Sequence, residues 1–332
     1  MKQATIHDIC KMTGLSLGTV SKYLNGGKVK EFNRKKLDDA VKKLHYQVDE
    51  YARGLVTNKT KTVGVLVSKL DNLFYSRIIS DIEKRLYKKG YATIIKESSY
   101  DHEKEIKSIS WFISRRVDAL IIFPIAYKKE DYEILENVDV PVIFLDNYVE
   151  GLDRDFVLTD NEHICYEVTD YVLGKGHKNI AIIISENNAY TARMRLSGFR
   201  KACEKHGLSS DSAKAYAINE DIDSAYNVAK EIVKTGRFSA VFAANYPSTL
   251  GVVYLLNEQN ISVPETISVI GFDDIMITNL YKPKLTIVNQ PMKEIAKKTV
   301  DRLFELIASP ELKKEVYILE NELIIGQTIA TL

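Results

Sequence analysis

The chain of 332 residues is too long for one ordinary domain, and with 45% hydrophobic and 27% charged residues it can bury sizeable cores. The N-terminal sequence MKQATIHDIC lacks an apolar segment, and no run of about 18 apolar residues occurs in the sequence, so we expect neither a secretion signal nor a membrane span. The cysteines at 10, 165 and 203 are far apart and follow no metal-ligand spacing. They indicate isolated, reduced thiols of a cytoplasmic protein.

The formal net charge of +1 hides an asymmetry along the chain. Residues 1–61 contain 13 Lys and Arg against 6 Asp and Glu, a formal charge of +7, whereas the remaining 271 residues carry −6. A small basic segment joined to a large acidic one favours a polyanionic partner for the basic segment. A solvated charged surface is the alternative explanation of the same numbers.

The basic segment predicts three short helices. Thr5 can cap a first helix with apolar residues at the 3.6-residue period, and Gly14 can end it because a residue without Cβ tolerates positive φ. Ser16 can cap a second helix over 17–24, and the three residues between the two helices match the spacing of a helix-turn-helix. A third helix is expected from an Asn33 cap. Its inward-facing residues would be Leu37, Ala40, Val41 and Leu44.

The second helix combines small and hydroxylated residues with one cation, Lys22. Such a helix can enter the DNA major groove with its N-terminus first, where bulky side chains would hold it out. Leu17 and Gly18 would then meet base edges, and Lys22 would reach guanine acceptors. Donors for phosphates would come from Ser16, Thr19, Ser21 and Asn25. The alternative is that these are ordinary cap and surface residues.

A further short helix is expected over residues 49–56, where Gly54 costs roughly 1 kcal/mol relative to Ala. Alone in water so short a helix is mostly unfolded. The polar sequence TNKTK that follows indicates a linker.

The sequence TIHDICKMTGLSLGTVSKYLNG, residues 5–26, resembles the DNA-binding head of the lactose-repressor/galactose-repressor family of bacterial transcription regulators. The resemblance implies that YARGL forms a hinge helix only when paired with its dimer mate on operator DNA, with Leu55 wedged into the minor groove. Lys22 stands where the family usually has Arg, and Val48 and Asp49 where it has Pro and Asn. The expected DNA-contacting residues are Thr5, Ser16, Leu17, Gly18, Thr19, Ser21, Lys22, Asn25, Ala52 and Leu55.

From residue 63 onward, short Val- and Ile-rich runs alternate with amphipathic stretches of helical period. Such runs predict parallel sheets covered on both faces, and two sets of four predict two doubly wound lobes. Ligands bind outside the carboxyl ends of the strands in such sheets, which between two lobes means a shared cleft. The runs are 63–68, 92–97, 119–124 and 140–146, then 180–185, 213–218, 240–245 and 267–274.

This part of the chain resembles the periplasmic-binding-protein-like effector domain of the same family, in NLFY (72–75), RRVDALIIFP (115–124), SVIGFDD (268–274) and LTIVNQP (285–291). The expected fold is an all-α helix-turn-helix head followed by an α/β two-lobed domain with doubly wound parallel sheets. The expected domains are a DNA-binding domain (1–47), a hinge helix and linker (48–61) and an effector-binding and dimerisation domain (62–332). The resemblance places the amino lobe at about 62–159 and 291–320 and the carboxyl lobe at about 160–290 and 321–332.

The resemblance also implies a set of effector-binding residues. Phe74 and Tyr75 would form ring walls, and Arg195 a charged clamp. A polyol suits this set, because it needs paired donors and acceptors and an apolar wall. Tyr246 stands where the family commonly has Asp, and Leu73 where it has Pro. The full set is Phe74, Tyr75, Phe123, Asp146, Asn161, Arg195, Asn245, Tyr246, Asp273 and Gln290.

We therefore expect a cytoplasmic, nucleoid-associated, homodimeric repressor of carbohydrate-utilisation genes. Its affinity for near-palindromic operator DNA would be controlled allosterically by a sugar or sugar phosphate bound between the lobes. The alternative is a cytosolic solute-binding receptor that responds to a nucleobase or another non-sugar metabolite. Since no nucleophile with its base, no phosphate loop and no metal cluster stands out, we expect no enzymatic activity, catalytic residue, metal, cofactor or membrane partner. The chain ends just after its last apolar run, which predicts dimers rather than tail-linked tetramers.

Overall fold

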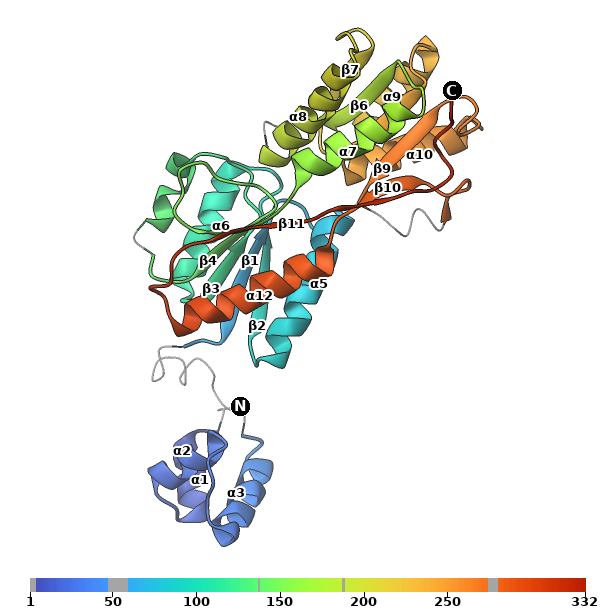
Figure 1. Ribbon diagram of the computed structural model, residues 1–332. Helices are drawn as coiled ribbons and strands as arrows, with labels where there is room; N and C mark the ends of the chain where they lie inside the picture. Colours follow the sequence, from blue (N-terminus) through green and yellow to red (C-terminus); the bar gives the residue numbers. More distant parts are fainter. Residues whose placement is uncertain (1–3, 47–58, 137, 187–188, 274–279) are drawn as a thin grey trace. The chain divides into compact units, whose positions relative to one another are not determined.

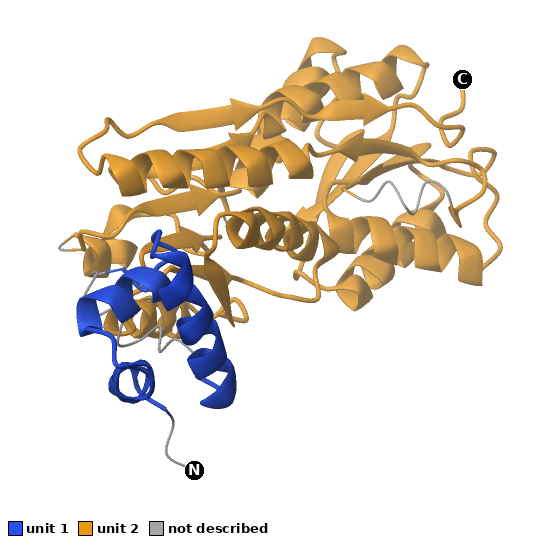
Figure 2. Ribbon diagram, turned by 90° about the horizontal axis from the view of Figure 1, so that it is seen from below, with its two compact units in different colours: residues 1–60 blue, residues 61–332 orange. Residues whose placement is uncertain are grey.

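The computed structural model describes residues 4–46, 59–136, 138–186, 189–273 and 280–332. Contacts divide the chain into two compact units, residues 1–60 and 61–332, which Figure 2 distinguishes by colour. The expected hinge helix over 49–56, with Ala52 and Leu55, lies outside the described residues.

The described part of the first unit, called the head below, contains the helices α1 (Ile6–Thr13), α2 (Leu17–Leu24) and α3 (Glu31–Lys43). The backbone N–H and the hydroxyl of Thr5 both donate to the Asp8 carboxylate at the start of α1. Gly14 ends α1 in the left-handed conformation, with φ 67°. Ser16 Oγ accepts the backbone N–H of Thr19 at the start of α2. These local features confirm the expected helix-turn-helix.

The expected start of the third helix is wrong. Helix α3 begins at Glu31 after an N-cap at Lys30, so Asn33 lies within its first turn. Val29 packs against the head core and so holds the chain where it turns into the helix. Glu31 in the first turn also interacts favourably with the helix dipole. Tertiary packing thus outweighs the cap preference of asparagine.

The head core is small. Four side chains are buried in it, and partly buried residues from all three helices pack around them. As expected, Leu37 and Ala40 face inward, and Val41 and Leu44 are partly buried. The four buried residues are Ile9, Val20, Leu37 and Ala40.

The second unit contains two six-stranded sheets, one in each lobe (Figure 1). The sheet of the amino lobe is wholly parallel, in the order β11-β5-β4-β3-β1-β2. Its strands are β1 (Thr62–Val67), β2 (Ala92–Glu97), β3 (Ala119–Ile122), β4 (Val142–Leu145), β5 (Asp155–Thr159) and β11 (Val316–Leu319).

The sheet of the carboxyl lobe has the order β12-β10-β9-β8-β6-β7 and is parallel except for the antiparallel pair β10–β12. Its strands are β6 (Ile180–Ser185), β7 (Ala213–Ile218), β8 (Ala240–Ala243), β9 (Ser268–Phe272), β10 (Thr286–Asn289) and β12 (Glu322–Ile324).

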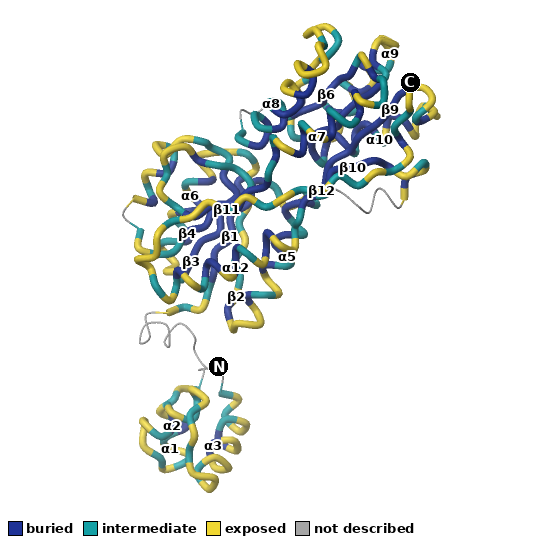
Figure 3. The backbone as a smooth tube through the Cα atoms, viewed as in Figure 1, coloured by how far each residue is buried: buried dark blue, intermediate teal, exposed yellow. Residues whose placement is uncertain are grey.

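Helices cover both faces of each sheet, as near-continuous apolar strands require. In the amino lobe, α5 (Leu73–Lys88) and α12 (Met292–Ala308) pack on one face, and α6 (His102–Ser114) and a 3-10 helix (Lys129–Leu135) on the other. In the carboxyl lobe, α9 (Ile222–Thr235) and α10 (Tyr246–Glu258) lie opposite α7 (Asn161–Gly174) and α8 (Tyr190–Lys205). Figure 3 shows the buried residues concentrated along the strands.

All eight expected runs form strands, and four further strands lie outside those runs. These are β5, β10, β11 and β12, each of three to five residues. Strands this short carry little periodic signal, and β11 pairs with β5 across more than 150 residues of chain. The chain crosses between the lobes after β5, after β10 and between β11 and β12 (Figure 1). Within the described ranges, no helix is long and apolar enough to cross a membrane.

Candidate effector pocket and DNA-binding face

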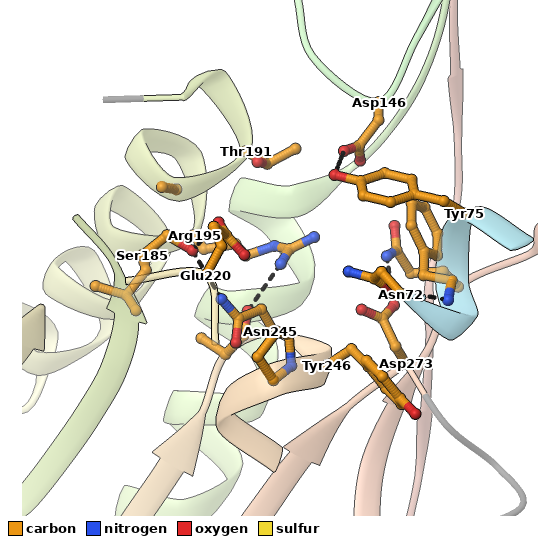
Figure 4. Close-up of a pocket in the computed structure, with 16 residues that line it drawn as sticks. Asn72, Tyr75, Asp146, Ser185, Thr191, Arg195, Glu220, Asn245, Tyr246 and Asp273 are labelled. Atoms are coloured by element: carbon orange, nitrogen blue, oxygen red, sulfur yellow. Dashed lines mark hydrogen bonds between the residues drawn. The ribbon is translucent and has the colours of Figure 1, made fainter. Parts of the chain in front are cut away.

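A pocket lies between the two lobes of the second unit, beside the carboxyl ends of their strands (Figure 4). Eight of the ten expected effector-binding residues line it: Phe74, Tyr75, Asp146, Arg195, Asn245, Tyr246, Asp273 and Gln290. The other lining residues are Asn72, Ile184, Ser185, Thr191, Ala192, Glu220, Ala244 and Pro247. Residues that lie as far apart in the sequence as positions 72 and 290 therefore form one site.

Asp146 and Asp273 occupy equivalent positions in the two lobes. Asp146 directly follows β4 and Asp273 directly follows β9, and both have a left-handed backbone, with φ 71° and 81°. The backbone N–H of each donates to the next strand of its sheet, to Val157 O at 3.1 Å and to Val288 O at 2.9 Å. Such a conformation costs a residue with a side chain about 1–3 kcal/mol, and strained residues cluster at functional sites.

The Asp146 carboxyl lies in a negatively charged environment. Burial raises its pKa to about 6, and Arg195 opposes this shift. Asp273 and Glu220 raise the same pKa further through charge repulsion. The Tyr75 hydroxyl donates to Asp146 at 3.5 Å, and burial raises the pKa of this tyrosine well above its usual value. Asp146 is therefore ionised at neutral pH and protonated in mild acid.

Among the described residues that line the pocket, Arg195 is the only cation, and only 6% of it is exposed. Its Nε donates to Asn161 Oδ1 at 2.7 Å, and one terminal nitrogen donates to Ala244 O at 2.8 Å. The guanidinium also lies over the Phe272 ring, 4.0 Å from the ring centroid. These contacts fix the guanidinium so that it points toward the middle of the pocket (Figure 4).

Phe123 and Asn161 do not line the pocket, contrary to expectation. Phe123 follows β3 on the face covered by α5, where its ring packs edge-on against Tyr75 at a centroid distance of 5.1 Å. Asn161 is the first residue of α7. Its side-chain oxygen accepts a hydrogen bond from Arg195, and its side-chain nitrogen donates one to Thr159 O. Both residues lie behind side chains of the pocket and orient them.

The carboxyl lobe contributes a chain of hydrogen bonds that the sequence reasoning missed. Asn245 caps α10, its Oδ1 accepting the Ser248 N–H at 2.8 Å. Its Nδ2 donates to Ser185 Oγ at 2.7 Å, and the Ser185 hydroxyl donates to the Glu220 carboxylate. Ser185 ends β6 and Glu220 follows β7, so the strand-end rule could have found both.

Polar contacts also connect the two lobes beside the pocket. The backbone N–H and the hydroxyl of Thr191, in α8, both donate to Asn147 Oδ1 at 3.2 Å. Two residues further along the same helix, Arg193 donates to Glu150 Oε1 at 2.9 Å. Asn147 and Glu150 belong to the segment between β4 and β5 of the amino lobe. These bonds can form only when the two lobes are close together.

In the head, α2 presents an exposed face that includes Leu17, Gly18 and Lys22, with 48% of Leu17 exposed. The side chain of Ser16 is also exposed and lies 3.0 Å from the Thr19 hydroxyl. A Cβ on Gly27 would approach Lys22 Cγ to 2.6 Å, so glycine at this position makes room for the lysine side chain.

The other expected DNA-contacting residues take part in local bonds. The Asn25 amide donates to Ser21 O at 2.9 Å, and Thr19 and Ser21 are half-buried. Thr5 is exposed at the start of α1. Thr5 and Ser16 occupy the N-cap positions of α1 and α2, as expected. Among the described residues, no group of His, Cys, Asp and Glu is arranged to hold a metal ion.

Comparison with known proteins places this architecture in a family. Residues 169–329 match the model of a periplasmic binding protein-like domain. Over 332 residues the chain is 31% identical to the HTH-type transcriptional repressor PurR of Vibrio atlanticus (strain LGP32), with 99% of each protein covered. It is 28% identical to the ribose operon repressor of Escherichia coli (strain K12), covering 94% of this chain and 96% of that protein.

Two solved structures show the same fold. The lac repressor dimer bound to operator and the anti-inducer ONPF matches with a TM-score of 0.88 and 23% identity, over 99% of this chain and 100% of that one. A LacI family transcriptional regulator from Enterococcus faecium with bound ribose matches with a TM-score of 0.75 and 28% identity. This second match covers 82% of this chain and 99% of that one.

The fold and the relatives together define a two-lobed transcription regulator with a helix-turn-helix head. The chain belongs to the lactose-repressor/galactose-repressor (LacI) family. Its relatives are transcriptional repressors, and the chain is accordingly a regulator of transcription rather than an enzyme.

Proposed function

We propose that this chain is a sequence-specific transcriptional repressor that binds near-palindromic operator DNA as a homodimer and responds to a small ligand held between its lobes. Residues 1–47 would bind DNA, 48–61 would form the hinge and linker, and 62–332 would bind the effector and dimerise. The protein would act in the cytoplasm, associated with nucleoid DNA. The observation that carries the proposal is the exposed face of α2 in a segment with a formal charge of +7.

On DNA, the exposed N-terminal turn of α2 would enter the major groove, with Leu17 and Gly18 against base edges. Lys22 lies one turn later and would contact guanine acceptors. The phosphate-binding role falls to Thr5, Ser16, Thr19, Ser21 and Asn25. Ala52 and Leu55 of the expected hinge helix would contact the minor groove.

The effector would be a sugar or sugar phosphate, and the regulated genes would serve carbohydrate use. Eleven of the sixteen lining residues carry a hydrogen-bonding side chain, as a polyol with hydroxyls on several sides requires. Two relatives point the same way, one being named as a ribose operon repressor and the other solved with bound ribose. A nucleobase is the alternative effector, and the rings of Phe74, Tyr75 and Tyr246 could stack on it.

Exposed apolar side chains on both lobes support a homodimer. Tyr87 at the end of α5 and Ile95 on the edge strand β2 are 75% and 39% exposed. In the carboxyl lobe, Ile222 and Tyr254 are 40% and 55% exposed, on the adjacent helices α9 and α10. Large apolar groups in solvent are typical of an association surface, and an unpaired edge strand favours pairing.

Ligand control would act through lobe closure. A ligand that contacts both lobes stabilises the arrangement in which Thr191 and Arg193 bond to the segment between β4 and β5. The resulting shift between the amino lobes of a dimer would strengthen or weaken the paired hinge segments. Coupling energies of about 1–3 kcal/mol are typical of such systems and suffice to change operator affinity about tenfold.

The test is a gel-shift titration of the full chain with duplexes selected from a random pool. We expect nanomolar binding whose affinity falls steeply as salt concentration rises. Adding the sugar that stabilises the protein most in a thermal-shift screen should change duplex affinity. Asp273→Ala should abolish that stabilisation while leaving duplex binding without sugar intact. Protein that ignores every duplex at low salt would refute the proposal.

A further inference from the structure

The pocket has an excess of hydrogen-bond acceptors and of negative charge. Asp146, Glu220 and Asp273 contribute three carboxylates, against the single guanidinium of Arg195. A carboxylate only accepts hydrogen bonds, and in a partly enclosed site its charge is weakly screened. Burial is the main cause of the raised pKa of Asp146, and the negative charges of Asp273 and Glu220 raise this pKa further.

Most hydrogen-bond donors in the pocket already donate to other groups of the protein. Gln290 Nε2 donates to Asp273, and Asn245 Nδ2 donates to Ser185. Arg195 donates hydrogen bonds from Nε to Asn161 and from one terminal nitrogen to Ala244. A ligand that matches this site therefore has to bring donors, and preferably positive charge, with it.

Glu220 is well placed to meet such a group. It lies in the loop after β7, and Ser185 orients its carboxylate within the hydrogen-bond chain that starts at Asn245 (Figure 4). Asp146 lies on the opposite, amino-lobe wall. The two carboxylates are therefore placed to accept hydrogen bonds from opposite sides of a ligand.

We propose that Glu220 makes the pocket selective for a polyol carrying a protonated amine, and that the pocket rejects phosphorylated ligands. The inference rests on the proposed function and narrows it. The ammonium group donates up to three hydrogen bonds to Glu220 and its neighbours and offsets part of the excess negative charge. A phosphate group brings acceptors and further negative charge, which this lining repels.

The test measures the affinity of the full chain by calorimetry for matched sugars that share one ring. The probes are glucose, glucosamine and glucose 6-phosphate, followed by galactose, galactosamine and galactose 6-phosphate. We expect at least one amino sugar to bind at least about tenfold more tightly than its parent sugar, the gain typical of a hydrogen bond between charged groups. The phosphates should bind more weakly than the parents.

Variants identify the residue responsible. Glu220→Gln keeps the size of the side chain and an oxygen for Ser185, and it should reduce the amine preference to less than about threefold. Ser185→Ala keeps the charge of Glu220 but removes the hydrogen bond that orients its carboxylate, so it should reduce the amine preference by a smaller factor. Glu204→Gln, which removes the same charge from an exposed position of α8, is the matched control and should leave the preference unchanged.

Parent sugars that bind as tightly as their amines in both series would overturn the inference, as would tighter binding of a phosphate or no binding of either amine. An amine preference that survives in Glu220→Gln would also overturn it. If a neutral sugar alters duplex affinity in those cases, the proposed function stands while the inference falls. Failure to bind any duplex would instead refute the proposed function.

Discussion

The head and the pocket are built in opposite ways. The exposed face of α2 comes from eight consecutive residues and their caps, and a core of four buried side chains supports it. The pocket draws residues from 72 to 290, and the strand ends of two sheets bring them together. A face made by neighbours in sequence depends on the local fold of its helix. A pocket made by distant residues depends on individual polar contacts between elements.

The largest effect should follow from damage to the head core. Ile9→Ala should cost the head about 2–5 kcal/mol, because the cavity lies in a core of only four residues. Duplex binding in a gel shift should be abolished, whereas the melting of the second unit and its stabilisation by sugar should stay unchanged. The control is Met12→Ala in the same helix, where 49% of the side chain is exposed and little should change. Loss of ligand response in Ile9→Ala would contradict the separation of the two units.

The next prediction concerns a single buried carboxyl of the pocket. The pKa of Asp146 is about 6 in the folded protein and 3.8 ordinarily, so the folded state binds the proton more tightly. Its contribution to stability is therefore fully present below about pH 4 and is lost as pH rises through 6. Asp146→Asn should stabilise the ligand-free protein by about 1–3 kcal/mol near pH 8.

Denaturant titrations between about pH 4 and pH 8 measure how Asp146→Asn changes the free energy of unfolding. The stabilising effect of Asp146→Asn should shrink toward zero near pH 4, and duplex binding by the head should not respond to the substitution. A variant that is less stable than the parent at high pH would mean that the ionised carboxylate is stabilised by its surroundings.

The third prediction concerns Lys22 on the exposed face of α2 in the head. Lys22→Ala should reduce discrimination at one operator base pair by about 1–3 kcal/mol, measured with duplexes that differ at single positions. Gly27→Ala is an informative companion, because the added Cβ displaces the lysine side chain and presses on the Lys22 carbonyl oxygen but leaves the charge in place. Equal loss on every duplex would assign Lys22 to phosphate binding.

The smallest expected effect belongs to a helix cap. Ser16→Ala removes the oxygen that accepts the Thr19 N–H and should destabilise the head by about 1 kcal/mol. Ser16→Asn, which keeps an acceptor, should restore most of that stability. If Ser16→Asn recovers stability but not duplex affinity, the serine hydroxyl contributes to DNA binding beyond its capping role.

The sequence alone determined those features that depend on neighbours along the chain. The helices at 6–13 and 17–24 follow from the capping of Thr5 and Ser16 and from the left-handed turn at Gly14. The long Val- and Ile-rich runs likewise predict buried parallel strands, because both faces of such strands must be covered. Motif resemblance identified eight residues of the pocket.

Only the tertiary structure decided which side chains face the cleft. It moved the start of α3 to Glu31 and placed Phe123 and Asn161 behind Tyr75 and Arg195. It also set the bounds and the pairing of four short strands. It also brought in Asn72, Ser185, Thr191 and Glu220. The physical reason is the range of the interactions. A cap bond joins residues three positions apart, whereas the direction of a side chain at a strand end depends on partners tens of residues away along the chain, such as Asn245 and Ser185.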